Sequence, residues 1–183
     1  RQVRTFNLDE YVGLPREHPE SYYRFMAEHL YRHVDLDPAN IHIPDGMAPD
    51  PEAECRRYEE ALRQAGHLDL VLLGLGLNGH IGFNEPGTPW DVRTRRVQLA
   101  ESTRQANARF FDSPDQVPRE ALTMGIGTML EARQILLLAS GPAKASIVRD
   151  VVRGEPSVMV PATALRGHPN VTVLLDREAA SLL

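Results

Sequence analysis

Four polar side chains, of which a histidine and a glutamate are suited to proton transfer, lie within one short, glycine-rich stretch of the chain. The stretch runs Gly74-Leu75-Gly76-Leu77-Asn78-Gly79-His80 and continues Ile81-Gly82-Phe83-Asn84-Glu85-Pro86-Gly87. Histidine exchanges protons near neutral pH, and a nearby carboxylate can orient its ring and stabilise the imidazolium form. A single histidine of this kind is more often a hydrogen-bonded loop residue. The gathering of Asn78, His80, Asn84 and Glu85 instead favours a functional site.

The same stretch also matches the G-x-G-x-x-G spacing of dinucleotide-binding loops, with Glu101 near the distance of a ribose-binding acid. That motif requires a helix to begin at its third glycine, so that the helix N-terminus faces a pyrophosphate. Here two further glycines and Pro86 follow His80, and no helix is expected. We therefore reject a nicotinamide site.

A second pair of acids, Asp9 and Glu10, follows the strand-forming stretch Val3–Leu8. A solvated turn or a helix cap explains such acids equally well. If the two acid-bearing loops share one edge of a sheet, Asp9 and Glu85 face each other across a single site.

Apolar patterning predicts the elements that position these loops. Residues 68–75 are almost all apolar, as expected for a strand buried on both faces of a parallel sheet. Ligands of such sheets bind beyond the carboxyl ends of the strands, where the glycine-rich stretch lies. Further strands are expected at 3–8, 41–43, 135–138 and 171–175, and helices at 19–33, 52–66 and 143–152. This alternation predicts an α/β fold, an open, mostly parallel Rossmann-like sheet with helices on both faces, in one domain over residues 1–183.

Composition excludes several classes of protein. The chain has 183 residues, 42% apolar and 25% charged, with a net charge of −5, so a nucleic-acid partner is not expected. No apolar run reaches the length of about 18 residues that a membrane span needs. Cys55 is the only cysteine, which rules out an intramolecular disulfide and fits a reducing cytoplasm. Composition leaves open whether the protein is a monomer or a homo-oligomer.

Five segments resemble the glucosamine-6-phosphate deaminase (isomerase) family. They are Thr5-Phe6-Asn7-Leu8-Asp9-Glu10-Tyr11-Val12-Gly13-Leu14, His18-Pro19-Glu20-Ser21-Tyr22-Tyr23, Gly79-His80-Ile81-Gly82-Phe83-Asn84-Glu85-Pro86, Ala106-Asn107-Ala108-Arg109-Phe110-Phe111 and Ala121-Leu122-Thr123-Met124-Gly125-Ile126-Gly127-Thr128. The resemblance implies isomerisation and deamination of glucosamine 6-phosphate to fructose 6-phosphate and ammonia, without a cofactor or metal.

The resemblance also implies residue roles. Asp9 matches the acid/base that moves a proton between C2 and C1, and His80 the acid/base that opens the sugar ring. Asn78 and Glu85 match the partners of His80. Some members of the family have Asp in place of Asn78, and because Asn carries no charge, Glu85 must be the main charged partner here.

Three further residues are expected to bind the substrate. Arg109 and Lys144 match the residues that hold the phosphate, and Glu10 belongs to the same matched segment as Asp9. A solvated surface cation is the alternative for Arg109 and Lys144. Residues 99–119 resemble a mobile lid, for which an ordinary surface helix and loop is the alternative.

Two departures from the family pattern concern the ends of the chain and its regulation. The chain starts in what resembles the middle of a domain, without the family's Gly-Gly-Thr/Ser-Pro phosphate loop. We therefore expect it to begin inside a longer protein, and a protein truly starting at Arg1 to be inactive or poorly folded. Val97 and Gln98 replace polar or basic positions of regulated members, although Arg93, Arg95 and Arg96 are present. No activation by N-acetylglucosamine 6-phosphate is expected.

Two other functions compete with deamination. A 6-phosphogluconolactonase would carry Asp-Gly-His followed by a Ser-Leu-Phe-Pro type run, whereas this chain has Phe83-Asn84-Glu85-Pro86. A non-catalytic sugar-phosphate sensor would not need Asp9, His80 and Glu85 together. An assay for ammonia release from glucosamine 6-phosphate separates these three functions.

Overall fold

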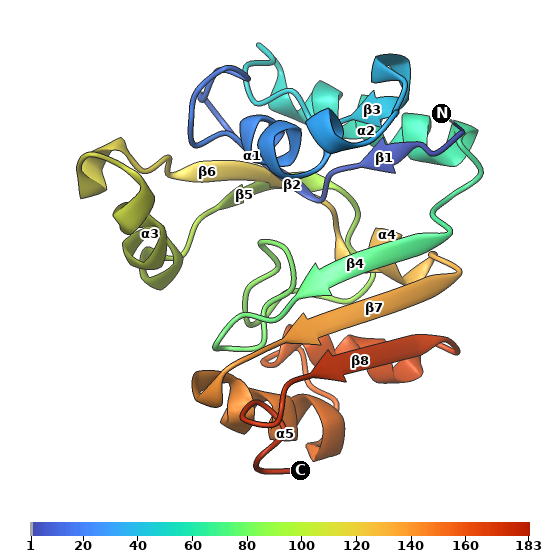
Figure 1. Cartoon of the computed structure of the whole chain (residues 1–183), viewed down its shortest axis with the longest axis vertical. Coiled ribbons are helices and arrows are strands. Elements are labelled where there is room, and N and C mark those ends of the chain that lie inside the picture. The colour runs from blue at the N-terminus through green and yellow to red at the C-terminus, as the bar shows by residue number, and fades with distance from the viewer. Residues whose placement is uncertain (1) are drawn as a thin grey trace. The chain divides into compact units, whose positions relative to one another are not determined.

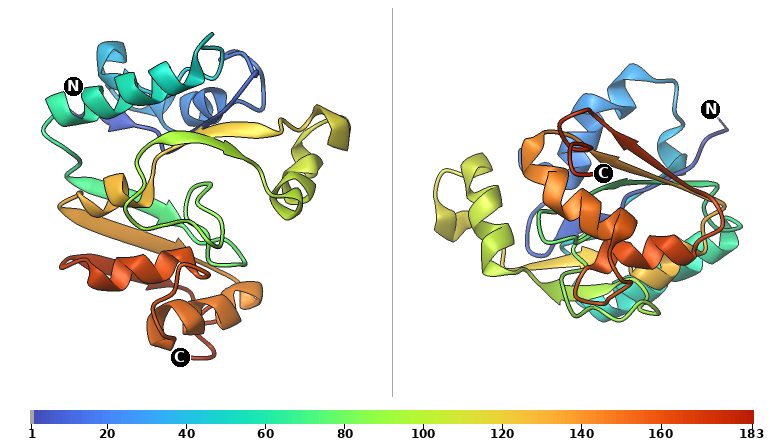
Figure 2. Two further views of the ribbon diagram at one scale, coloured as in Figure 1. Left: turned by 180° about the vertical axis from the view of Figure 1, so that it is seen from behind. Right: turned by 90° about the horizontal axis from the view of Figure 1, so that it is seen from below.

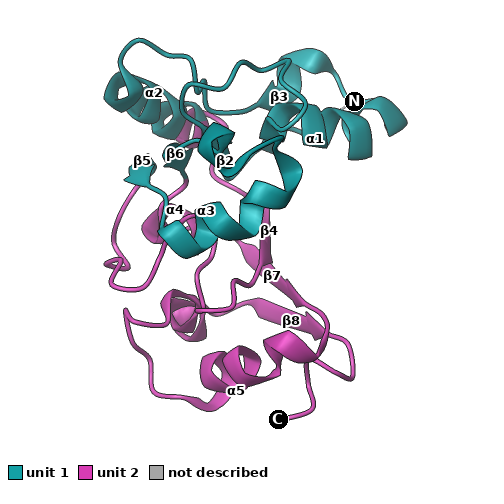
Figure 3. Cartoon of the chain, turned by 90° about the vertical axis from the view of Figure 1, so that its left-hand side faces the viewer, with its two compact units in different colours: residues 1–61, 94–123 teal, residues 62–93, 124–183 magenta. Residues whose placement is uncertain are grey.

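The computed structural model describes residues 2–183, which divide into two compact units (Figure 3). Unit 1 comprises the chain up to Ala61 together with Thr94–Thr123. Unit 2 comprises Leu62–Arg93 together with Met124–Leu183. Each unit is therefore assembled from two separate stretches of sequence. The single domain expected over residues 1–183 stays a prediction.

Unit 1 contains two small sheets. Strand β1 (Thr5–Phe6) pairs in parallel with β3 (Ile41–His42), and β2 (Asp9–Tyr11), β6 (Glu120–Thr123) and β5 (Arg95–Gln98) form an antiparallel sheet in the order β2-β6-β5. Its helices are α1 (Tyr22–His29), most of α2 (Pro51–Gln64) and α3 (Glu101–Asn107), with short 3₁₀ turns η1 (Tyr31–His33), η2 (Pro38–Asn40), η3 (Ala108–Phe110) and η4 (Pro114–Gln116). Figure 1 labels the main elements.

A buried tyrosine connects the two parallel strands of unit 1 to α2. Tyr58 is fully buried, and its hydroxyl donates to the carbonyls of Asn7 (2.8 Å) and His42 (3.3 Å) at the ends of β1 and β3. The rings of Phe6 and His42 stack with centroids 4.3 Å apart. The Tyr58 hydroxyl thus gives the Asn7 carbonyl a partner and the His42 carbonyl a second one, since the His42 carbonyl also accepts from the Asn7 N–H at 3.0 Å.

Unit 2 is built on a parallel sheet of three strands in the order β4-β7-β8 (Figures 1 and 2). These are β4 (Leu70–Gly74), β7 (Gln134–Ala139) and β8 (Val171–Leu175), with helices α4 (Ile126–Leu130) and α5 (Ala145–Arg153) and 3₁₀ turns η5 (Pro142–Lys144) and η6 (Pro161–Gly167). Ile135, Leu137 and Val71 are buried in this sheet, and α5 buries Val148 and Val151.

The three carboxyl ends of this sheet carry polar segments. Gly74 ends β4 and begins the glycine-rich stretch, Lys144 follows β7, and Asp176 follows β8. Asp176 Oδ2 accepts a hydrogen bond from the Gly141 N–H at 2.8 Å. Adjacent parallel strands bring their following loops together, which is the arrangement expected of a binding edge.

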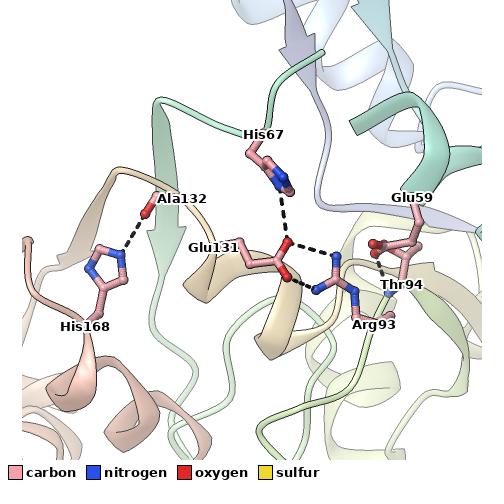
Figure 4. Close-up of polar contacts among 7 residues, drawn as sticks. All are labelled: Glu59, His67, Arg93, Thr94, Glu131, Ala132 and His168. Atoms are coloured by element: carbon pink, nitrogen blue, oxygen red, sulfur yellow. Dashed lines mark hydrogen bonds and ion pairs between the residues drawn. The ribbon is translucent and has the colours of Figure 1, made fainter. Parts of the chain in front are cut away.

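Polar contacts around Glu131 connect three segments of unit 2 (Figure 4). Glu131, just after α4, accepts a hydrogen bond through Oε2 from Arg93 Nη2 at 3.0 Å. The same oxygen lies 3.2 Å from His67 Nδ1, just before β4. The carboxylate therefore ties the end of α4 to the segments on either side of the glycine-rich stretch.

Two further contacts in Figure 4 satisfy backbone groups near strand ends. In unit 2, His168 Nε2 lies 2.8 Å from the carbonyl oxygen of Ala132, ahead of β7. In unit 1, Glu59 accepts from the Thr94 N–H at 2.7 Å, just before β5 begins. Such contacts supply partners to backbone groups that the strands themselves do not pair.

The α/β class and the open, mostly parallel arrangement are confirmed, with strands and helices close to the expected positions. Two expectations need correction. The segment Asp9–Tyr11 is an antiparallel strand and not a loop, because it pairs with β6, which no local pattern marks. Leu70 and Leu72 are 51% and 55% exposed, so β4 is not buried on both faces over the described residues. No helix among residues 2–183 is long and apolar enough to cross a membrane.

Candidate active site

The glycine-rich stretch after β4 folds back on itself instead of starting a helix. The Gly76 N–H donates to the His80 carbonyl (2.9 Å), and the Gly79 N–H donates to the Gly76 carbonyl (3.0 Å). Gly79 has φ +84°, a conformation that residues with side chains rarely adopt. The resulting tight loop has no helix N-terminus that could face a pyrophosphate. The expectation that no helix begins at the third glycine is therefore confirmed.

Asn84 anchors the far side of this loop. The side chain is fully buried, and its Nδ2 donates to the carbonyls of Ile81 and Met124, both at 2.9 Å. Ile81 and Phe83 are buried beside it. Asn84 therefore fixes the loop from inside, while His80 and Glu85 on either side of it remain partly accessible.

His80, Asn78 and Glu85 form a continuous hydrogen-bond chain. His80 Nδ1 lies 2.7 Å from Asn78 Oδ1, and Asn78 Nδ2 donates to Glu85 Oε2 at 2.8 Å. Glu85 Oε2 also lies 3.5 Å from His80 Nδ1. Since an amide oxygen only accepts, Nδ1 carries the proton and the neutral ring has its lone pair on Nε2. The chain thus fixes both the orientation and the tautomer of the imidazole.

Gly76 supplies the surface against which the His80 ring lies. A β-carbon at Gly76 would overlap His80 Nδ1 and Cε1, closer than any real contact. Only a residue without a side chain admits the ring in this position. Sequence reasoning did not single out this role, because Gly76 stands among other glycines of the same stretch.

Lys144 lies against the same loop. Its Nζ donates to the Leu75 carbonyl, so the cation from the segment after β7 reaches the segment after β4. Burial lowers the pKa of the Lys144 ammonium from its ordinary value. A partly desolvated ammonium gains from an anion, which is consistent with the phosphate-binding role predicted for it.

Asp9 lies in unit 1, on β2. Asp9 pairs with Thr123 of β6, and the fully buried Thr123 hydroxyl donates to Asp9 Oδ1. Paired residues of antiparallel strands project from the same face of a sheet, so the register itself brings these side chains together. Thr123 is a second residue that the sequence analysis missed, and only its strand pairing reveals it.

Glu10 projects from the opposite face of β2 and caps α1. Its carboxylate accepts from the N–H groups of Tyr11 (2.9 Å), Tyr22 (3.0 Å) and Tyr23 (3.0 Å), and the residue is 3% exposed. Burial raises the pKa of the Glu10 carboxyl, against the lowering by these N–H donors. The substrate-binding role predicted for Glu10 stays a prediction, and a structural role in holding α1 is evident.

Arg109 lies in the segment that was predicted to be a lid. The segment 99–119 contains α3, η3 and η4, and Arg109 Cζ lies 4.6 Å from the centroid of the Phe110 ring. Asn107, two residues earlier, donates from Nδ2 to the Tyr11 hydroxyl at 2.9 Å. Within unit 1 the structure thus connects the strand of Asp9 to the segment of Arg109.

The structure therefore groups the predicted residues in two sets. Asn78, His80, Glu85 and Lys144 lie together at the carboxyl edge of the parallel sheet in unit 2. Asp9, Glu10 and Arg109 belong to unit 1. The predicted approach of Asp9 to His80 and Glu85 stays a prediction.

Comparison with known proteins places this geometry in a family. A family model described as glucosamine-6-phosphate isomerases/6-phosphogluconolactonase matches residues 1–174. The chain belongs to this family. Within it the chain groups with the deaminases: it is 56% identical over 182 residues to the glucosamine-6-phosphate deaminase of Halothermothrix orenii, covering 100% of this chain and 76% of that protein. It is 55% identical over 183 residues to that of a Geobacillus species, covering 100% and 73%.

Solved structures agree with this grouping. A monomeric glucosamine-6-phosphate deaminase superposes with a TM-score of 0.98 at 54% identity, over 100% of this chain and 76% of that one. A 6-phosphogluconolactonase from Trypanosoma brucei gives a TM-score of 0.72 at 26% identity, over 98% and 74%. The two kinds of protein share the fold, and the chain is far more similar to the deaminase.

Proposed function

We propose that this chain is an enzyme that converts glucosamine 6-phosphate and water into fructose 6-phosphate and ammonia, and that Asp9 and the His80–Asn78–Glu85 chain carry out its proton transfers. The observation that supports these roles best is the hydrogen-bond chain that leaves the lone pair on His80 Nε2. An imidazole held in one tautomer is prepared to accept and return a proton.

His80 acts in ring opening. The closed sugar hides its aldehyde, so a proton must leave the C1 hydroxyl and another must reach the ring oxygen. His80 Nε2 takes the first proton and, as imidazolium, returns it to the ring oxygen while the C1–O bond to that oxygen breaks. Glu85 stabilises the imidazolium through Asn78, since its Oε2 accepts from Asn78 Nδ2.

Asp9 acts in the isomerisation that follows. The carboxylate removes the C2 proton of the open aldose while the ammonium group of the substrate gives a proton to the C1 carbonyl oxygen, which yields an enolamine. Asp9 then delivers its proton to C1, which leaves an iminium ion at C2. Water adds to this iminium ion, one of the water protons moves to the nitrogen, and ammonia leaves from the resulting carbinolamine as the hydroxyl proton is released and the ketone forms. The hydrogen bond from Thr123 holds the Asp9 carboxylate in one orientation for both transfers.

Charged groups hold the substrate phosphate in this proposal. Lys144 supplies a point charge and Arg109 a planar fork of donors. Glu10 supports the same strand as Asp9 through its three bonds to backbone N–H groups. We also propose a cytoplasmic location, because a charged sugar phosphate stays in the compartment where it is made.

Ammonia release by the full-length protein tests the activity. We expect ammonia from glucosamine 6-phosphate, little hydrolysis of 6-phosphogluconolactone, and hyperbolic saturation that N-acetylglucosamine 6-phosphate leaves unchanged. Asp9→Asn should lower kcat by about a hundred- to ten-thousand-fold while substrate binding persists. Lactone hydrolysis without ammonia would support the lactonase instead.

Deuterium exchange separates the two proton-transfer stations. Fructose 6-phosphate, incubated with ammonia and the enzyme in D₂O, should gain deuterium at its C1 carbon. Asp9→Asn should abolish this exchange. A His80→Gln variant should retain a larger fraction of the parent's exchange rate than of its rate of ammonia release, because the open-chain ketose enters the reaction after the ring-opening step. Equal loss of both activities in His80→Gln would contradict the division of roles.

A further inference from the structure

Tyr11 occupies the centre of a cluster that joins β2 to the segment of Arg109. The ring of Tyr11 stacks on Tyr22 of α1 (centroids 5.1 Å apart, interplanar angle 28°) and meets Phe111 edge-on (6.1 Å, 77°). Phe111 also stacks on His18 at 6.1 Å. The chain segment on either side of Arg109 is thus held by side chains of unit 1 that lie far from it in sequence.

The Tyr11 hydroxyl adds a directional contact to this cluster. It accepts from Asn107 Nδ2 at 2.9 Å, and Tyr11 is 4% exposed. Burial raises the pKa of the Tyr11 phenol, so it remains neutral and keeps the same hydrogen-bonding form throughout the working pH range. Asn107 is the last residue of α3, where the chain turns into η3 and reaches Arg109.

Space beside this contact leaves the segment room to shift. A pocket of about 220 Å³ is lined by Tyr11, Tyr22, Phe25, Asn107, Phe110 and Phe111, among others. Burial of apolar surface is non-directional and by itself would tolerate sliding of Phe110 and Phe111 within this space. The hydrogen bond fixes one position of the segment relative to Tyr11, because it holds Asn107 Nδ2 at a set distance from the Tyr11 hydroxyl oxygen.

We propose that Tyr11 is a positioning residue that, through its hydrogen bond to Asn107, sets the place of Arg109 for binding the substrate phosphate. Tyr11 lies two residues from Asp9 on the same strand, so one rigid element carries the acid/base and fixes the phosphate ligand. The inference rests on the phosphate role of Arg109 stated above. Tyr11 acts on binding of the phosphate group and not on the proton transfers.

Kinetics of the full-length enzyme test this role with variants Tyr11→Phe, Asn107→Ala and their combination. Loss of one hydrogen bond should raise KM for glucosamine 6-phosphate, and Ki for inorganic phosphate as a competitive inhibitor, by about three- to tenfold. The kcat should change by less than about twofold. The double variant should be no worse than Tyr11→Phe alone, because the bond that Asn107→Ala removes is already lost in Tyr11→Phe, which also loses the hydrogen bond between the Tyr11 and Tyr22 hydroxyls.

Two controls make the outcome specific. Tyr31→Phe removes another buried tyrosine hydroxyl, which donates to Asn7 Oδ1 at 2.6 Å, and should lower the melting temperature without changing KM or Ki. Arg109→Ala should raise both constants more than Tyr11→Phe does. If Arg109→Ala raises them while Tyr11→Phe and Asn107→Ala do not, the positioning role is wrong. If Arg109→Ala changes neither constant, the phosphate role is wrong and this inference falls with it.

Discussion

The imidazole of His80 occupies the space that a β-carbon on Gly76 would need. The two residues also share a backbone contact, since the Gly76 N–H donates to the His80 carbonyl at 2.9 Å. The ring is thus confined on one side by backbone and on another by Asn78 Oδ1. Positioning of the proposed ring-opening residue depends as much on a missing side chain as on its polar partners.

Replacing Gly76 by alanine should therefore damage catalysis more than stability. The new methyl group would overlap His80 Nδ1, so the ring must turn and lose Asn78. We expect kcat for ammonia release to fall by about a hundredfold or more. Gly74→Ala is the matched control, because a β-carbon there meets nothing within 4 Å. Similar activity of the two variants would disprove the positional argument.

A charge at position 78 should shift the pH dependence of activity. In Asn78→Asp, a second carboxylate beside His80 stabilises the imidazolium form, so neutral imidazole is reached only at higher pH. The acid limb of the kcat/KM profile should move to higher pH, while activity at the optimum stays within about tenfold of the parent. Asn78→Leu, which breaks the chain to Glu85, should lose activity at every pH. An unchanged profile in Asn78→Asp would argue against contact between these side chains in solution.

The buried carboxyl of Glu10 should make the free energy of unfolding depend on pH. Burial raises the pKa of its carboxyl in the folded state, so its contribution to the free energy of unfolding is greatest below the ordinary value of 4.5 and declines as pH rises through the folded value. Glu10→Gln should be destabilised by about 1–2 kcal/mol through poorer capping of α1. Urea unfolding should show a larger difference in the free energy of unfolding between parent and variant at pH 4 than at pH 7. A difference that grows with pH would mean that the N–H bonds lower the pKa of Glu10 by more than burial raises it.

Thr123 should matter for turnover more than for binding. Thr123→Val keeps the branched shape suited to the central strand but removes the hydroxyl that donates to Asp9. We expect kcat to fall by about tenfold with KM changed by less than about threefold. Thr123→Ser, which restores a hydroxyl, should recover most of the loss. Full activity of Thr123→Val would show that Asp9 needs no partner on β6.

Local pattern was enough to predict the larger elements of the fold. The apolar run before Gly74 and those at β7 and β8 indicated a parallel sheet, and the polar loop follows the carboxyl end of β4 as expected. Periodicity located α1, α2 and α5 to within a few residues. These features depend on neighbours in sequence, which is why residue order alone predicts them.

Short strands and their pairing could not be predicted in the same way. Asp9–Tyr11 has only three residues, and its partner β6 lies more than a hundred positions further on. A strand of that length becomes stable only when a distant segment completes its hydrogen bonds. The same holds for the packing of segment 99–119, where Tyr11 and Asn107 meet across a separation of 96 residues.

Residue types at fixed local spacing encode the family and the α/β class, so both could be predicted from the linear chain. The same patterns marked the candidate residues for the chemistry, but the atomic details around these residues emerged from the folded molecule alone. They are the lone pair on His80 Nε2, the hydroxyl of Thr123 on Asp9, and the Glu10 carboxylate that caps a helix. Those assignments follow from hydrogen bonds and close packing between segments, and both vary with distances of a few tenths of an ångström that no linear pattern specifies.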